Sequence, residues 1–233
     1  KEIYQKTSLY FFGLFSKIAR TPIIYCAYQA EKTHNKYGFY SSKSIVIQNR
    51  LAKKLVFENT QNPFTKGAYI LYVGRYNRAK GPDRLLEIAE ILLPKNPKYS
   101  LLIAGDGWDS DTIPYKLKKQ VVLLGNVKDM APLYKYATAL LFTSYTEGYP
   151  NVLVEAAVCG TPIIGFSAGD SPYILEDYSL GSLVISQSSF CTQLQQLMEN
   201  SVSLKEREDI AKVTIARFNF KETFREYKNF IFP

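Results

Sequence analysis

From residue 68 onward, short apolar runs alternate with amphipathic segments, and this alternation restricts the possible folds more than any other feature. Residues 68–73 form an apolar run that Gly74 stops, and residues 83–93 place apolar side chains on one helical face. The pattern predicts further strands over 100–104, 121–124, 139–143 and 162–166 and further helices over 131–137 and 151–159. Strands that are apolar throughout are typical of a parallel sheet buried between layers of helices. We therefore expect an α/β fold.

Glycine-rich loops follow the predicted strands. Gly74, the sequence Gly105-Asp106-Gly107 and Gly125 each stand directly after a strand. In parallel sheets, ligands bind in the crevice outside the carboxyl ends of the strands. We expect the binding site of this chain at that edge of the sheet.

The first 62 residues show a less regular pattern. They predict an aromatic-rich amphipathic helix over 9–18 and strands over 22–27 and 44–48. Four regions are expected: a remnant of a separate domain at 1–62, a linker at 63–67, a ligand-binding domain at 68–203 and closing helices at 204–233. Because the chain starts at Lys1 within a helical pattern, we expect it to be part of a longer protein.

The excess positive charge lies at the start of the chain. The net charge is +8, and residues 1–66 carry eleven Lys and Arg side chains against three glutamates. These residues form either a solvated basic surface or a surface that attracts an anionic membrane or an anionic acceptor. Nothing in them matches a zinc finger, a helix-turn-helix or an RNA-recognition motif, so we expect no nucleic-acid partner.

The cysteines and the hydropathy bear on localisation. Cys26, Cys159 and Cys191 have no metal-ligand spacing, which favours buried thiols in a reducing compartment. The sequence shows no signal-peptide pattern, and no apolar run approaches the roughly 18 residues of a membrane span. We expect a soluble cytoplasmic protein, with any membrane contact being peripheral.

Two carboxylates, Glu147 and Glu155, flank a predicted helix start near Pro150-Asn151. The unpaired amides and the dipole at a helix N-terminus favour phosphate. Glu147 beside such a site suits a ligand that continues from phosphate into a polyol, because a carboxylate accepts hydrogen bonds from two neighbouring hydroxyls. Glu155, further along the helix, would bind a ribose. On spacing alone, two surface glutamates beside a capped helix are the alternative.

Two cations stand on a loop at the same predicted edge. Gly74-Arg75 ends the first strand, and Lys80-Gly81 precedes the next helix. Fixed cations can neutralise the charge that develops on a diphosphate leaving group without a metal ion. We therefore expect a site for a diphosphate-linked sugar that needs no metal and no cofactor. Ordinary solvated basic residues are the alternative.

Residues 68–185 resemble the retaining glycosyltransferases of family 4, which have the two-domain GT-B architecture with Rossmann-like sheets. The motifs that carry the resemblance are Gly74-Arg75, Lys80-Gly81, Gly105-Asp106-Gly107, Gly125-Asn126-Val127 and the stretch from Glu147 to Glu155. The resemblance implies that Arg75 and Lys80 bind the donor diphosphate and that Glu147 contacts the donor sugar, so these three are the expected catalytic residues. The other implied contacts are Gly74 beside the diphosphate, Val127 at the base, Glu155 at the ribose, and the backbone of Gly148, Tyr149, Pro150, Asn151, Val152 and Leu153 at sugar and phosphate.

The resemblance also extends to the ends of the chain. Residues 1–62 look like the tail of the acceptor-binding domain, with Ile47-Gln48-Asn49 as its final strand and exit. In the family the last helix crosses back to that domain, which fits residues 218–230. Most of the acceptor domain is missing, including its usual glycine-rich loop and histidine.

The chain departs from the family pattern at several positions. Tyr173 stands where the family often has a glutamate. His34, the only histidine, is expected to be structural or exposed. Asp109-Ser110-Asp111 is similar to the metal-binding Asp-x-Asp of the other major glycosyltransferase fold, but it lies in a predicted surface loop, so we expect no metal there.

The expected function is that of a retaining hexosyltransferase. It would move a sugar from a UDP- or GDP-sugar to a glycan or lipid-linked acceptor in bacterial surface polysaccharide assembly, such as capsule, O-antigen, lipopolysaccharide or exopolysaccharide. Basic residues 1–66 would contact the cytoplasmic face of the inner membrane. Two alternatives stay open: a nucleotide-sugar binding module without transfer activity, and a nucleotide-sugar epimerase or sugar-phosphate-directed synthase of the same fold.

Overall fold

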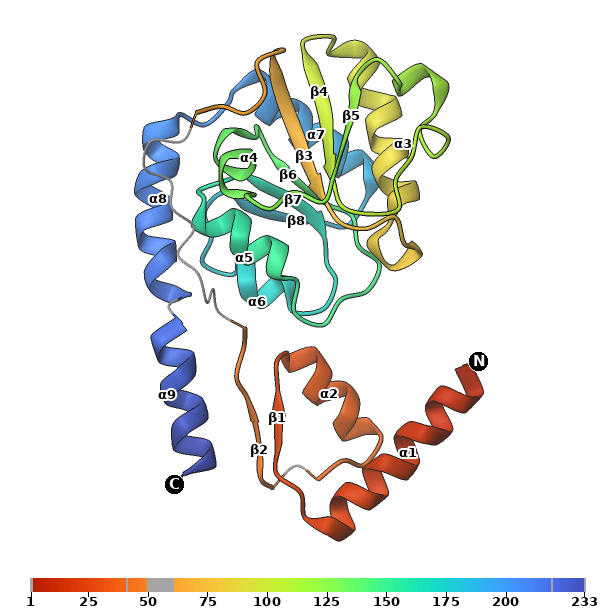
Figure 1. The fold of residues 1–233 in the computed structure, drawn as a ribbon, viewed down its shortest axis with the longest axis vertical. Helices are drawn as coiled ribbons and strands as arrows, with labels where there is room; N and C mark the ends of the chain where they lie inside the picture. Colours follow the sequence, from red (N-terminus) through yellow and green to blue (C-terminus); the bar gives the residue numbers. More distant parts are fainter. Residues whose placement is uncertain (1, 41, 50–60, 219, 233) are drawn as a thin grey trace.

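A computed structural model describes residues 2–40, 42–49, 61–218 and 220–232. Its main body is a six-stranded sheet with the strand order β5-β4-β3-β6-β7-β8 (Figure 1). The strands are β3 (Ala68–Val73), β4 (Tyr99–Ala104), β5 (Val121–Gly125), β6 (Leu140–Phe142), β7 (Ile163–Phe166) and β8 (Gly181–Val184). Each pair of neighbouring strands is parallel. The predicted α/β fold is therefore confirmed.

Helices cover both faces of this sheet. One face packs against α3 (Pro82–Leu92) and α7 (Gln187–Glu199), and the other against α4 (Ala131–Tyr136), α5 (Asn151–Val158) and α6 (Ser171–Leu175). Side chains of the central strand β3 alternate between the two cores. Tyr69 and Leu71 enter the core beneath α4, α5 and α6, whereas Ile70 and Tyr72 enter the core beneath α3 and α7. Burial on both faces explains why the strands are apolar throughout.

Short-range sequence signals set the start of α3. A short 3-10 helix, η1 (Arg78–Lys80), comes first, and its N-cap Asn77 accepts a hydrogen bond from the Ala79 amide. Gly81 then adopts a left-handed conformation with φ 63°, and Pro82 occupies the first helical position. A Cβ on Gly81 would lie 2.1 Å from the Thr143 carbonyl oxygen, so the close approach requires glycine. The two further 3-10 helices of the described residues are η2 (Leu93–Lys95) and η3 (Tyr115–Leu117).

The N-terminal elements form a separate group at the lower end of the molecule (Figure 1). They are α1 (Glu2–Ala19), β1 (Ile23–Tyr25), α2 (Tyr28–Lys36) and β2 (Ser44–Val46), and β1 pairs with β2 in parallel. Ala27, between β1 and α2, is fully buried in the core of the main body that includes α4, α5 and α6. The group therefore packs directly against the main body.

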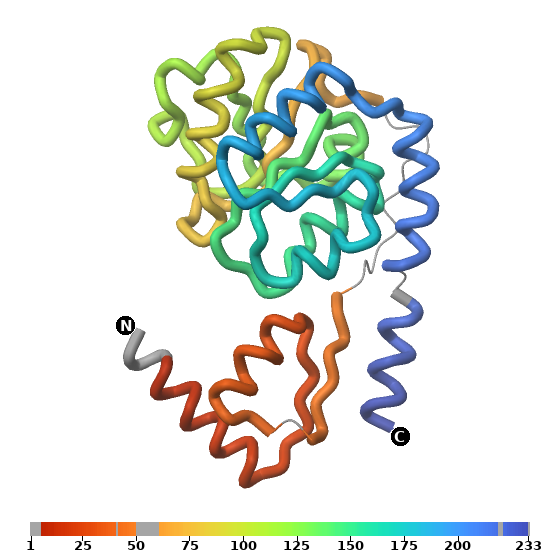
Figure 2. Tube along the Cα trace, turned by 180° about the vertical axis from the view of Figure 1, so that it is seen from behind, coloured from red at the N-terminus to blue at the C-terminus, as the bar shows by residue number. Residues whose placement is uncertain are grey.

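Two helices close the chain. α8 (Leu204–Arg217) packs against α5, and α9 (Phe220–Ile231) continues from it toward the level of the N-terminal elements. As a result, α1 and α9 lie at the same end of the molecule (Figure 2).

The sequence-based boundaries of the strands, and those of the helices over 83–93, 131–137 and 151–159, agree with the structure to within two residues. The helix predicted over 9–18 is longer and spans Glu2–Ala19, whereas α2, β8 and α7 had no sequence prediction. The predicted region boundaries, with a linker at 63–67, stay a prediction; residues 61–67 contain no helix or strand, and residues 50–60 lie outside the described residues. Cys159 is buried and Cys191 half-buried, but Cys26 is exposed, contrary to the expectation of buried thiols.

Candidate functional site

The strand order places a topological switch point between β3 and β6. After β3, the chain adds β4 and β5 on one side, and then β6, β7 and β8 on the other. Loops that follow the two central strands diverge at such a point and leave a crevice outside the carboxyl ends. The loops here are residues 74–81 after β3 and 143–150 after β6. Arg75, Lys80 and Glu147 all belong to these two loops.

Lys80 and Glu147 meet across the switch point. Lys80 Nζ lies 2.6 Å from Glu147 Oε1, and the Ser144 hydroxyl donates to the same oxygen at 2.8 Å. The side chains are 30% and 12% exposed, so both remain within reach of a ligand. A charge-assisted hydrogen bond at this distance fixes the position of the carboxylate.

Hydrogen bonds of the backbone join the same two loops. The Ala79 carbonyl accepts from the Tyr145 amide at 2.8 Å. The Thr143 hydroxyl donates to the carbonyl oxygens of Lys80 at 3.1 Å and Gly81 at 3.0 Å. The two loops are therefore held together by hydrogen bonds within the protein.

Arg75 lies on the same loop as Lys80. Its side chain is exposed, and within the described part of the chain no carboxylate pairs with it. The preceding Gly74 donates its amide to the Ala104 carbonyl at 2.9 Å. Gly105 passes so close that a Cβ on it would lie 2.3 Å from the Gly74 carbonyl oxygen. Arg75 is thus an unpaired cation on a fixed loop.

The segment from Gly148 to Leu153 presents free amides at the start of α5. Gly148 is exposed and borders open space, and Pro150, the N-cap of α5, has no N–H and receives no side-chain cap. The Leu153 amide donates to the Pro150 carbonyl at 3.0 Å, so it is not available to a ligand. Among the described residues, the amides of Asn151 and Val152 have no acceptor, which leaves them to an anion at the helix N-terminus.

The core and a neighbouring loop hold this segment from behind. The side chains of Tyr149 and Leu153 are 8% and 0% exposed and belong to the core. Gly169 has φ 56°, and a Cβ on it would lie 2.4 Å from the Gly148 carbonyl oxygen and 2.5 Å from that of Glu147. These two side chains therefore support the site through packing, and Gly169 supports it through close backbone contact.

Glu155 does not join Glu147 but turns inward toward α4. The Tyr134 hydroxyl donates to Glu155 Oε2 at 2.7 Å. Burial raises the pKa of Glu155, and the hydrogen bond from Tyr134 opposes that rise. Burial, followed by the Glu155 charge, raises the pKa of Tyr134 well above its usual value, so Tyr134 stays a hydrogen-bond donor. The hydrogen bond from Tyr134 of α4 therefore holds the carboxyl of Glu155 in one orientation.

The Val127 loop lies at the same edge of the sheet. Gly125 accepts a hydrogen bond from the Gly105 amide at 2.8 Å, and Asn126 Nδ2 donates to Asp106 Oδ2 at 2.9 Å. Val127 itself is half-buried and packs against the core. The loops after β4 and β5 are thus joined side by side, next to the loop that carries Arg75.

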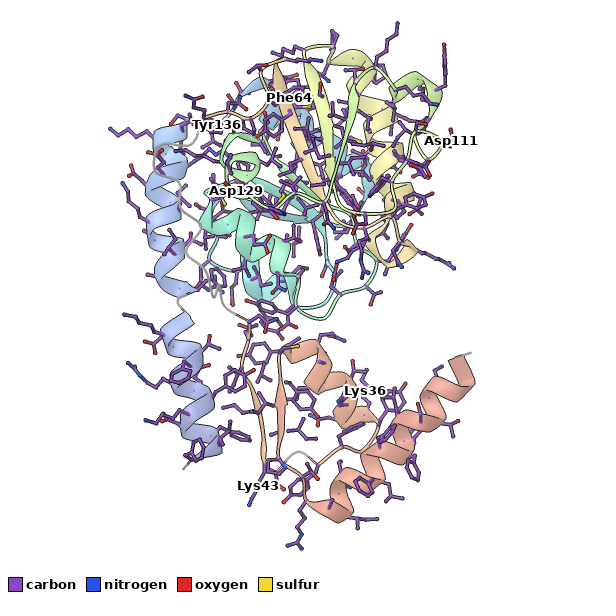
Figure 3. All side chains as sticks on the ribbon, viewed as in Figure 1. Lys36, Lys43, Phe64, Asp111, Asp129 and Tyr136 are labelled. Carbon is purple, nitrogen blue, oxygen red and sulfur yellow. The ribbon has the colours of Figure 1, made fainter. Side chains whose placement is uncertain are left out.

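The Asp109-Ser110-Asp111 sequence forms a surface turn. Asp109 Oδ1 accepts hydrogen bonds from the Asp111 and Thr112 amides at 2.9 Å each. Both aspartates are exposed, and Asp111 lies at the outer edge of the molecule, across the view from α5 (Figure 3). Among the described residues, no three His, Cys, Asp or Glu side chains gather where they could hold a metal ion.

Two further positions singled out in the sequence make aromatic contacts. His34 stacks on Phe39 with ring centroids 4.2 Å apart, and burial lowers its pKa. Tyr173, in the place of the expected glutamate, packs against Tyr28 of α2 at 4.9 Å. His34 therefore packs as a structural residue, and Tyr173 contacts the N-terminal group.

The surface of α1 is unusually apolar. Its large exposed side chains are Tyr10, Phe11, Phe12, Leu14, Phe15 and Ile18, each at least 56% exposed. No described helix has both the length and the apolar character that a membrane crossing requires. Lys36 and Lys43 lie in the same lower part of the molecule as α1 (Figure 3).

Three residues that fix the site had no sequence prediction: Ser144, Tyr134 and Gly169. Ser144 follows β6 at the predicted edge and could have been proposed from that position. Tyr134 lies in a helix whose apolar pattern indicates only burial. Gly169 lies in the loop before α6, and its closeness to the Gly148 loop is a tertiary contact that no local pattern indicates.

Fold and loops together define an α/β protein in which two cations, a carboxylate and helix amides lie on neighbouring loops at the switch point of a parallel sheet. Residues 56–217 match the model of the family described as glycosyl transferases group 1. Since this match covers more than half of the chain, the chain belongs to that family.

Relatives and solved structures agree with this assignment. An uncharacterized glycosyltransferase of Haemophilus influenzae is 23% identical over 208 residues, which cover 86% of this chain and 56% of that protein. A Campylobacter jejuni relative, GalNAc-alpha-(1->4)-GalNAc-alpha-(1->3)-diNAcBac-PP-undecaprenol alpha-1,4-N-acetyl-D-galactosaminyltransferase, is 35% identical over 97 residues, covering 40% of this chain and 27% of that protein. The chain thus spans about half or less of the length of these curated relatives.

The crystal structure of Anabaena HepE in complex with UDP and glucose superposes with a TM-score of 0.77 at 15% identity. The superposition covers 97% of this chain and 67% of HepE. At this identity the likeness concerns the fold alone, and it confirms the GT-B-type arrangement of a parallel sheet with helices on both faces.

Proposed function

We propose that this chain is the donor-binding part, with a portion of the acceptor side, of a metal-independent retaining hexosyltransferase of glycosyltransferase family 4. The protein would transfer a sugar from a nucleotide-diphosphate sugar to an acceptor. One observation carries the proposal: Lys80 and Glu147 form a 2.6 Å ion pair at the switch point, next to the free amides at the start of α5.

The proposed chemistry rests on the charge of the leaving group. When the bond between the sugar and the diphosphate breaks, negative charge builds up on the diphosphate oxygens. Arg75 and Lys80, with the Asn151 and Val152 amides, would stabilise that charge. Glu147 would accept hydrogen bonds from hydroxyls of the sugar through Oε2, since Lys80 and Ser144 both contact Oε1. In a retaining reaction the leaving phosphate assists the incoming hydroxyl, so the proposal needs no separate base, metal or cofactor.

Glu155 and Val127 would hold the nucleoside. Tyr134 contacts Glu155 Oε2, which favours Oε1 as the acceptor for a ribose hydroxyl. Val127 would border the base. The presence of UDP in the HepE structure supports a UDP-sugar as the donor, with a GDP-sugar as the alternative.

The acceptor is proposed to be a glycan or a lipid-linked glycan in bacterial surface polysaccharide assembly. The name of the Campylobacter relative includes a PP-undecaprenol group, which supports this class of acceptor. Exposed aromatic side chains on α1 and the basic residues of the first 66 positions support a peripheral contact with anionic lipid at the cytoplasmic face of the membrane.

A thermal-shift panel tests the donor site. Wild-type protein would be melted with UDP, GDP, ADP and their sugars, alongside Arg75→Ala, Glu155→Ala and the control Lys119→Ala, which changes an exposed lysine away from the site. A ligand at a hundredfold excess over its Kd stabilises the fold by about 2.7 kcal/mol. We expect a shift in the wild type and the control and a smaller one in both site variants, with no change on adding EDTA. No response of the wild type to any nucleotide rejects the proposed site.

Product analysis separates the alternatives. A transferase releases the nucleotide only when an acceptor is supplied, whereas an epimerase converts the nucleotide sugar without one. A module that only binds releases no nucleotide beyond background hydrolysis. This chain covers only part of the length of its relatives. Nucleotide binding without transfer would therefore support the donor site but not the transfer activity of this chain.

A further inference from the structure

Asp170 caps a helix that belongs to a distant part of the chain. The Asp170 side chain is fully buried, and its carboxylate accepts hydrogen bonds from the Tyr28 and Gln29 amides at 2.8 Å each. Gln48 Nε2 donates to it at 3.2 Å. Tyr28 and Gln29 are the first two residues of α2, whose own N-cap, Ala27, has no side-chain cap. Asp170 therefore supplies the cap that α2 lacks.

The same residue is tied to the Gly148 loop through its backbone. The Asp170 amide donates to the Gly148 carbonyl at 2.9 Å, and the preceding Gly169 lies against the carbonyl oxygens of Glu147 and Gly148. Although Asp170 directly precedes α6, its side chain makes no cap to that helix. Its carboxylate is thus used entirely for the N-terminal group.

A buried carboxylate needs its hydrogen-bond donors, so this contact is costly to break. Removing a charged group from water is costly unless hydrogen bonds compensate for it, and the positive end of the α2 dipole adds to that compensation. If α2 moved away, the carboxylate would lose both backbone donors. The position of α2 is therefore coupled to the position of the Asp170 backbone, and through it to Gly148.

Two weaker contacts flank the cap. Asn49 Nδ2 lies 3.4 Å from Asn151 Oδ1 at the start of α5, and the rings of Tyr28 and Tyr173 pack at 4.9 Å. The first joins Asn49 to the start of α5, and the second joins α2 to α6. Of the three contacts, that of the Asp170 carboxylate with two backbone amides is the strongest.

We propose that Asp170 is a positioning residue that sets the N-terminal group at one place relative to the Glu147–Gly148 loop. This inference rests on the proposed function in one respect: the Glu147–Gly148 loop is taken as the donor loop, and the N-terminal group as part of the acceptor side. Asp170 then fixes the position of the acceptor side relative to the bound donor. Ligand binding at the donor loop would change the stability of the first turn of α2.

Amide hydrogen exchange of the whole chain tests this, with UDP and GDP as probes. In the wild type we expect the Tyr28 and Gln29 amides to be protected, and the nucleotide that stabilises the chain to slow their exchange further. In Asp170→Asn, one of the two carboxylate oxygens becomes an NH2 group that cannot accept a hydrogen bond, so one of the two amides loses its acceptor. That amide should exchange about tenfold faster, and the nucleotide should no longer affect it. Asp111→Asn, which changes an exposed aspartate, should behave as the wild type.

A matched pair of variants keeps the test decisive if Asp170→Asn folds poorly. Tyr28→Pro removes one of the two amide donors, and proline is well tolerated at the first position of a helix after the extended Ala27. Tyr28→Ala removes the same ring but keeps the amide. We expect the Gln29 amide to lose its response to nucleotide in Tyr28→Pro and to keep it in Tyr28→Ala.

The outcomes separate the inference from the proposed function. If no nucleotide shifts the melting temperature of the wild type, the donor site is rejected. Amide exchange at Tyr28 and Gln29 without nucleotide still decides whether Asp170 caps α2. If nucleotide shifts the melting temperature but the exchange of these amides responds equally in wild type and Asp170→Asn, the positioning role is rejected.

Discussion

Lys80 Nζ and Glu147 Oε1 lie 2.6 Å apart, although one residue follows β3 and the other follows β6. These strands are neighbours in the sheet. The ion pair therefore joins the two halves of the sheet at the switch point, where the direction in which strands are added changes. A cation and a carboxylate that neutralise each other form a polar pair able to bind a phosphate on one side and hydroxyls on the other.

Lys80→Ala should weaken the binding of UDP or GDP by about tenfold to a hundredfold. The range follows from about 1.5–3 kcal/mol for a hydrogen bond to a charged group. Isothermal titration calorimetry measures it, with Lys119→Ala as the exposed control. Equal affinities in the two variants would mean that Lys80 does not contact the diphosphate.

Glu155 should make stability depend on pH. Its folded-state pKa is raised by burial, so its contribution is fully present below the unfolded-state pKa of about 4.3 and is lost as pH rises through the folded-state value. We expect the unfolding free energy of the wild type to fall relative to Glu155→Gln as pH increases from about 4 upward. Urea titrations across this range, with the exposed Glu87→Gln as a control, provide the measurement. Parallel curves for the wild type and Glu155→Gln would contradict the prediction.

Tyr134→Phe should destabilise the fold by about 1–3 kcal/mol, because it removes the hydroxyl that donates a hydrogen bond to Glu155 Oε2. The hydrogen bond opposes the rise of the Glu155 pKa, so its removal should raise that pKa further. A double-mutant cycle with Glu155→Gln, followed by urea unfolding, isolates the coupling. Tyr115→Phe, at a residue that is 91% exposed, serves as control. Additive effects of Tyr134→Phe and Glu155→Gln would show that the two side chains do not interact.

Gly169→Ala and Gly148→Ala should differ sharply. At Gly169, φ 56° disfavours alanine by about 1–3 kcal/mol, and the new Cβ would collide with the carbonyl oxygens of Glu147 and Gly148. Nucleotide binding should weaken with it, because the loop must shift. A Cβ at Gly148 meets open space, so this variant should retain the wild-type melting temperature. Thermal unfolding with and without UDP compares them, and equal melting temperatures would refute the loop contact.

The sequence was sufficient for the inner strands β3, β4, β6 and β7 because they are largely buried, whereas the half-buried edge strand β8 had no sequence prediction. Residues 68–73 are apolar at every position and correspond to β3 in full. Lys80 and Glu147 could be placed at one edge of the sheet because each lies in the loop after an apolar strand, and the structure brings them into contact.

Other elements depend on contacts that no local pattern encodes. α2 buries no side chain completely, and its cap comes from Asp170, 142 positions from Tyr28. α7 places only Phe190, Leu194 and Met198 in the core, a stripe too narrow to stand out among its polar residues. For the same reason, Glu155 could be assigned to the helix after Pro150, but its inward orientation toward Tyr134 could not.

The central place of β3 also has a consequence for the order of assembly. β3 is the first strand of the six-stranded sheet to be synthesised, and β4 and β5 can complete one side of it at once. Its other edge waits for β6, which pairs through Leu71 and Leu140. Until then, an apolar strand edge is open to association with other nascent chains. Closure of that edge is the same event that brings Glu147 to Lys80, so the ion pair forms only in a chain whose central strand is paired on both sides.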